Sequence, residues 1–219
     1  MSCMELMALP IIAICICIAP MFSGEYQSGA DNIILSSRYG KSKLVVAKIL
    51  SSFIFAFIVY TINIFVGLGI VLFSFGIDGW SLPIQIINST TPYALTFLQA
   101  TSICILTIYL VMFAMVSITL LLSAKLKTAF SVLIIMICII MMPLFFNISE
   151  TNGVWNHIDI ILPYISCQSV FGSDFNNYFS YPLPGFTMDI LTMRIVIYLI
   201  ITAICIPFAY RTFKKHQVA

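Results

Sequence analysis

Long apolar runs alternate with short polar connections along this chain, and five of the runs approach or exceed the length of a membrane crossing. An α-helix of about 20 mostly apolar residues covers the roughly 30 Å of hydrocarbon in a bilayer. The pattern predicts membrane spans at about residues 6–22, 46–73, 93–122, 129–146 and 190–210. Because the second and third runs are longer than a perpendicular crossing needs, we expect these helices to be tilted or to project into water. The predicted fold class is an all-α polytopic membrane protein, with residues 1–219 forming a single transmembrane domain.

The composition agrees with this class. Of the 219 residues, 61% are hydrophobic and only 8% are charged, whereas a soluble domain carries about 25% charged residues. A membrane β-barrel would show segments of roughly ten residues with alternating polarity instead of continuous apolar runs. Five of the seven cysteines lie within apolar runs, where cysteine behaves as a small hydrophobe. With no CxxC pair and only two histidines, the sequence predicts neither a metal site nor a cofactor.

Basic residues gather in alternate connections, and this arrangement predicts the topology. Lys and Arg near the ends of spans are retained on the cytoplasmic side. Nine of the ten basic residues lie in or beside the first connection, the third connection and the tail: Arg38, Lys41, Lys43, Lys48, Lys125, Lys127, Arg211, Lys214 and Lys215. The connections between them, residues 74–92 and 147–189, carry acidic residues and no basic residue. We therefore predict that the N-terminus lies outside and the C-terminus inside.

The first connection, residues 24–45, is the one long polar and basic stretch of the chain. Apolar residues recur there at i, i+4, i+7 and i+8 and predict one face of a short amphipathic helix: Tyr26, Ala30, Ile33 and Ile34. Glu25 would then lie in the first turn, at the positive end of the helix dipole. Two interpretations remain open. The helix either lies on anionic headgroups or is a cytoplasmic docking element for another protein.

The residue order favours docking. The pattern begins with F-x-x-E-x-x-x-G, which is formed by Phe22, Glu25 and Gly29. An apolar triplet, two small polar residues, a basic turn and the pair "AK" follow it: Ile33-Ile34-Leu35, Ser36-Ser37, Arg38-Tyr39-Gly40-Lys41 and Ala47-Lys48. It resembles the segment after the second span in permeases of type-2 ATP-binding cassette (ABC) exporters, and the order of spans from Met1 to Ala219 is similar to that family as well. Family members usually have six spans, and the first is absent here. The chain is then complete, truncated or one part of a split permease, and we expect a missing upstream span.

The resemblance implies a permease subunit of the bacterial cytoplasmic membrane that forms a homo- or heterodimer and docks two cytoplasmic ATPases. The coupling residues that it implies are Glu25, Gly29, Ile33, Ile34, Arg38 and Lys41. The residues themselves agree in one respect, since the chain has no G-x-x-x-x-G-K-[ST] phosphate loop and cannot hydrolyse ATP by that chemistry. The central parts of the spans hold no Asp, Glu, Lys or His, which favours a hydrophobic or amphipathic substrate such as a peptide antibiotic, a drug or a lipid-linked compound.

A few polar residues fall inside the predicted spans. No Asp, Glu, Lys or His lies in the central part of any span, so a proton relay is not predicted. Arg194 is about one turn from the outer end, where it either snorkels to the interface or meets an anionic headgroup. Asn63 and Gln99 are predicted at depth, where an amide needs a partner. Each makes an interhelical hydrogen bond or lines a translocation path.

Residues 147–189 form an acidic outer segment rich in aromatic residues, which are favoured at membrane interfaces. The segment is either an interfacial cap or, by resemblance, a set of re-entrant helices that seal the outer exit. Two other classes of function need different features. An intramembrane enzyme needs Ser/His, paired Asp or HExxH groups in the spans, and none is present. A non-transporting scaffold or immunity protein that binds a toxin or sensor remains the alternative to the exporter.

Overall fold

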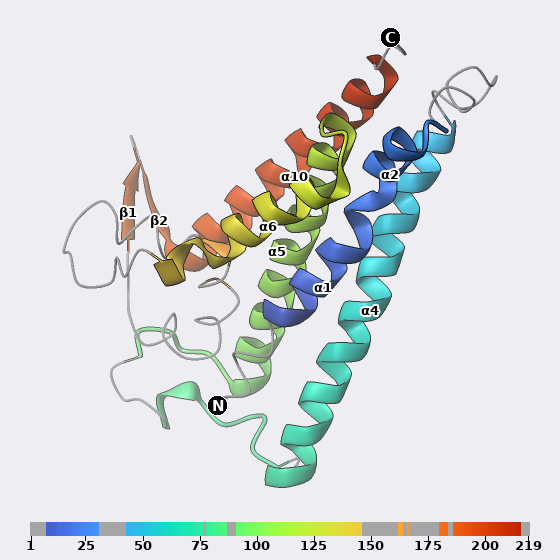
Figure 1. Cartoon of the computed structure of the whole chain (residues 1–219). Coiled ribbons are helices and arrows are strands. Elements are labelled where there is room, and N and C mark those ends of the chain that lie inside the picture. The colour runs from blue at the N-terminus through green and yellow to red at the C-terminus, as the bar shows by residue number, and fades with distance from the viewer. Residues whose placement is uncertain are drawn as a thin grey trace.

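In a computed structural model, the described part of the chain is a bundle of long helices with a small β-hairpin (Figure 1). The structure describes residues 8–30, 43–76, 78–86, 91–145, 162–163, 166, 180–183 and 186–215. The helices are α1 (Ala8–Ile18), α2 (Pro20–Ser28), α4 (Lys43–Phe75), α5 (Phe97–Lys125), α6 (Ala129–Phe145), α10 (Ile190–Lys215) and the short 3-10 helix η2 (Ile84–Ile86). Strands β1 (Ser180–Leu183) and β2 (Phe186–Asp189) pair antiparallel, with Ser180 opposite Asp189.

Four stretches of helix are long and apolar enough to cross a membrane. They are Leu9–Ser28, which comprises most of α1 and all of α2, Lys43–Ser74, Phe97–Lys125 and Ile190–Lys214. These four stretches confirm the prediction of a mostly helical, multi-pass membrane protein. The predicted span at 129–146 is helical too, but α6 has only 17 residues and ranks as a shorter apolar helix. The hairpin of β1 and β2 was not predicted.

Helix α5 is the centre of the bundle, and α1, α2, α4, α6 and α10 all pack against it (Figure 1). Most side chains in its middle are buried, and Val111, Met112 and Met115 are fully buried. Helix α4, by contrast, leaves large side chains such as Phe65 and Phe73 exposed. Apolar side chains that face lipid carry no hydrophobic penalty, so a membrane helix needs only one packed side.

The first helical stretch differs from the prediction at its end. We predicted a span that ends at Phe22 and a separate helix that begins near Glu25. Instead, α2 begins at Pro20 and continues to Ser28, which places Glu25 in its last turn. Proline is tolerated at the first helical position because its missing N–H has no partner there in any case. Pro20 therefore starts a new helix within the span, and the continuation of that span carries Glu25.

Helix α5 also begins later than predicted, at Phe97 rather than near Tyr93. Thr96 is the N-cap, and its hydroxyl accepts a hydrogen bond from the N–H of Gln99 at 3.4 Å. The side chain of Gln99 in turn accepts from the N–H of Thr96 at 3.1 Å. This capping box satisfies two N–H groups and fixes the start of the helix.

The ends of the helices that carry basic residues lie together. The end of α2, the start of α4, the turn between α5 and α6 and the end of α10 share one end of the bundle, away from the hairpin (Figure 1). We call it the basic end, because it carries Lys43, Lys48, Lys125, Lys127, Arg211 and Lys214. The helix ends that flank the basic connections therefore lie at one end of the bundle. Which side of the membrane this end faces stays a prediction.

Candidate functional site

At the basic end, α2 is held by three other helices. We call this cluster the four-helix junction. It consists of Phe22, Glu25 and Tyr26 on α2, Lys48 on α4, Ser123 on α5 and Phe213 on α10. Phe22, Ser123 and Phe213 are fully buried. Glu25 and Tyr26 of this junction lie at the start of residues 24–45, the segment that was predicted to dock a second protein.

Lys48 ties α4 to the end of α2. Its ammonium group forms an ion pair with the carboxylate of Glu25 and donates a hydrogen bond to the carbonyl oxygen of Met21 at 2.8 Å. It also lies 5.1 Å from the centre of the Phe22 ring. The side chains of Lys48 and Glu25 are only 16% and 17% exposed. A charge that has lost most of its water needs such partners, so each residue holds the other in place.

Ser123 ties α5 to the break between α1 and α2. Its hydroxyl accepts hydrogen bonds from the N–H groups of Phe22 and Ser23 at 3.0 and 3.1 Å, and donates one to the carbonyl oxygen of Ala19 at 2.7 Å. A hydroxyl offers one donor and two acceptor positions, so all of its capacity is used. N–H groups in the first turn of a helix have no partner within that helix. Ser123 supplies the partner from another helix.

Tyr26 and Phe213 complete the junction. The hydroxyl of Tyr26 donates to the carbonyl oxygen of Ala124 at 3.1 Å. The Phe213 ring lies 4.8 Å from that of Phe22 and 6.0 Å from that of Tyr26, between ring centres. Aromatic pairs at such distances add to the stabilisation that burial provides. The last turns of α5 and α10 are therefore both attached to α2.

Gly29 ends α2 with a Schellman motif. Its φ angle is +68°, a backbone conformation that residues other than glycine rarely adopt. Its N–H donates to the carbonyl oxygen of Tyr26 at 3.4 Å, and the N–H of Ala30 donates to that of Glu25 at 3.1 Å. A Cβ added at Gly29 would meet no atom within 4 Å. Glycine is needed here for its backbone conformation and not for space.

Three of the residues that carry the resemblance, Phe22, Glu25 and Lys48, thus meet in one cluster, with Gly29 one turn beyond Glu25. Four of the predicted coupling residues lie outside the residues that the structure describes: Ile33, Ile34, Arg38 and Lys41. Sequence reasoning missed Ser123 and Phe213. The sequence signal for Ser123 was weak. A serine near the end of a long apolar run needs a hydrogen-bond partner, but the sequence does not show which residue is that partner.

The polar residues predicted at depth have different placements. Gln99 lies in the first turn of α5, where its side chain belongs to the capping box. Asn63 is half-buried in the middle of α4. An interhelical hydrogen bond nearby joins the hydroxyls of Thr61 and Tyr109 at 2.7 Å. Whether Asn63 or Gln99 lines a translocation path stays a prediction.

Arg194 is fully buried near the start of α10, which contradicts the interpretation that it snorkels to the interface. Surrounding protein therefore encloses its side chain. Within the part of the chain that the structure describes, no group of three or more His, Cys, Asp or Glu residues could hold a metal ion.

Comparisons of this chain with protein-family models, with curated proteins and with solved structures found no match.

Proposed function

We propose that this chain is a membrane-spanning permease subunit of an ABC exporter, and that the four-helix junction receives the motion of a separate ATPase. The observation that supports the proposal most strongly is the ion pair between Glu25 and Lys48. Both positions belong to the pattern that resembles the permease family, and they lie 23 positions apart in the sequence. Their contact supplies a physical reason for the pattern, because it joins α2 and α4, the helices on either side of the docking segment.

The mechanism follows from the contacts of α2. An ATPase that binds residues 24–45 would push or pull on the end of α2. Lys48 and Phe213 attach that end to α4 and α10, Tyr26 attaches it to the carbonyl group of Ala124 on α5, and Ser123 attaches the start of α2 to α5. A displacement of α2 therefore moves three other helices with it instead of bending one helix alone. The break at Pro20 lies within the same stretch and is the place where α1 can change its angle to α2.

The energy source and the substrate class follow from what the chain contains. ATP must be hydrolysed by a partner, since the chain has no phosphate loop. The central parts of the predicted spans hold no Asp, Glu, Lys or His, which suits a hydrophobic or amphipathic substrate such as a peptide antibiotic, a drug or a lipid-linked compound. In this proposal, two permease subunits lie in a bacterial plasma membrane and bind two ATPases on its cytoplasmic side.

Co-expression of this chain with each ABC ATPase of the same genome, followed by co-purification and ATPase assays, tests the proposal. We expect one of these ATPases to form a complex with the chain in which the ATPase rate is several-fold higher than that of the ATPase alone. Glu25→Gln should reduce this stimulation, whereas Gln85→Glu at the opposite end should not. A result in which no ATPase binds or changes its rate would defeat the proposal. Binding without ATP-driven transport in vesicles would instead indicate the scaffold.

A further inference from the structure

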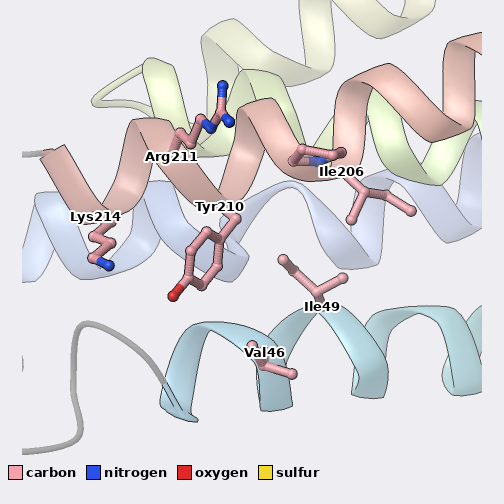
Figure 2. Close-up of a pocket in the computed structure, with 7 residues that line it drawn as sticks. Val46, Ile49, Ile206, Tyr210, Arg211 and Lys214 are labelled. Carbon is pink, nitrogen blue, oxygen red and sulfur yellow. The ribbon is translucent and has the colours of Figure 1, made fainter.

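An open groove separates α4 from α10 at the basic end (Figure 2). Its volume is about 430 Å³, within the range of about 300–1,000 Å³ that is typical of ligand sites. Val46 and Ile49 form the wall on α4, and Ile206 and Pro207 form the wall on α10. The walls are therefore apolar, as the acyl chain of a lipid requires.

The mouth of the groove carries a positive charge. Lys214 and Tyr210 lie on the side of α10 that faces α4, whereas the guanidinium group of Arg211 points the other way (Figure 2). The Lys214 ammonium lies 5.8 Å from the centre of the Tyr210 ring. Lys214 is exposed, and no described carboxylate lies within ion-pair distance of it. An ammonium group and a phenol hydroxyl are both suitable donors to a phosphate.

We propose that this groove binds a phospholipid with an anionic headgroup, from the leaflet at the basic end. One acyl chain would lie between Val46, Ile49 and Ile206, and the phosphate would lie at Lys214 and Tyr210. In a bilayer that α4 and α10 cross, Lys214 at the mouth of the groove would lie among the headgroups, and the apolar walls of the groove would lie beside acyl chains. An apolar helix of another protein would leave the charge of Lys214 without a partner. The site depends on the membrane placement of α4 and α10 and not on coupling to an ATPase.

Photolabelling of the full chain in vesicles tests this site. The probes are phosphatidylglycerol and phosphatidylcholine, each with a photoreactive group in the acyl chain, in a background of unlabelled phosphatidylcholine. We expect phosphatidylglycerol adducts to concentrate on residues 46–49 and 206–210. Lys214→Gln should lower them about fivefold, which corresponds to the loss of about 1 kcal/mol per basic residue at an anionic surface.

Three further variants make the result specific. Lys127→Gln removes another exposed charge at the same end, outside the groove, and should leave labelling unchanged. Lys214→Arg keeps the charge and should keep the labelling. Ile206→Trp fills the groove and should lower adducts of both lipids.

Three outcomes would contradict the proposal that this groove binds an anionic phospholipid. The first is equal labelling by both lipids that Lys214→Gln does not change. The second is adducts spread evenly along the exposed side of α4. The third is crosslinking of the groove to a second copy of the chain, which would make it a protein interface.

Discussion

At the scale of single residues, the hydroxyl of Ser123 satisfies three backbone groups at the break between α1 and α2. Ser123→Ala would leave two N–H groups and one carbonyl group in a buried place with fewer partners. Interhelical hydrogen bonds in membranes contribute about 0.6–2 kcal/mol each, so we expect a loss of about 2 kcal/mol in the free energy of unfolding. Unfolding by a denaturing detergent in mixed micelles measures this change in the free energy of unfolding.

Ser102→Ala is the matched control for Ser123→Ala. Ser102 is exposed, lies on the same helix and donates to the carbonyl oxygen of Leu98 in its own helix. Its replacement should change the stability by less than about 0.5 kcal/mol. Equal effects of the two replacements would show that Ser123 does not join the helices.

The pair of Glu25 and Lys48 gives a second prediction at this scale. Because both side chains are largely buried, removing either should leave the other without its partner. We expect a coupling energy of about 1.5–3 kcal/mol in a double-mutant cycle of Glu25→Gln and Lys48→Gln. Unfolding free energies of the four proteins give this value. Additive effects would mean that the pair does not hold α2 and α4 together.

At the scale of elements, the conformation of Gly29 sets where α2 stops. Gly29→Ala should destabilise the protein by about 1–2 kcal/mol, because an L side chain is strained at a positive φ. Gly24→Ala is the control, since Gly24 lies inside α2 and its added Cβ would make an ordinary contact with Pro20 at 3.5 Å. That change should be neutral or should stabilise the helix by up to about 1 kcal/mol. Thermal unfolding of both variants in detergent measures the difference.

The helices were predictable from the sequence, but several of their ends were not. Apolar runs locate long helices because a span must be apolar throughout. An apolar run does not show where backbone hydrogen bonds stop. The end of α2 depends on Gly29, and the start of α5 depends on the pair of Thr96 and Gln99. These signals are single glycine or polar residues next to apolar residues, and an average of hydropathy along the chain does not detect them.

The site was predictable only in part, for a similar reason. The order of residues singled out Glu25 and Lys48, but their ion pair requires that α2 extends past Phe22 and lies beside α4. Phe213 lies near the other end of the chain and has no local feature that indicates a role. Its role depends on α10 packing beside α2, and no residue pattern within one helix reveals that neighbour.

At the scale of the whole molecule, charge should set the orientation of the bundle. We expect the basic end to face the cytoplasm because Lys and Arg near spans are retained there. Lys127→Cys should react with a membrane-impermeant maleimide only in inside-out vesicles, and Gln85→Cys only in intact cells. Labelling of the unaltered chain provides the background from its own cysteines. The reverse pattern would show that the predicted docking segment faces the exterior.

The central claim is that a separate ATPase contacts the protein at the end of α2. A photoreactive amino acid in place of the exposed Gln27, at the tip of α2, tests it most directly, with the same group in place of Gln85 at the far end as control. We predict an adduct with an ATP-binding cassette protein from position 27 and none from position 85. Absence of that adduct from position 27, or equal adducts from both positions, would contradict the account.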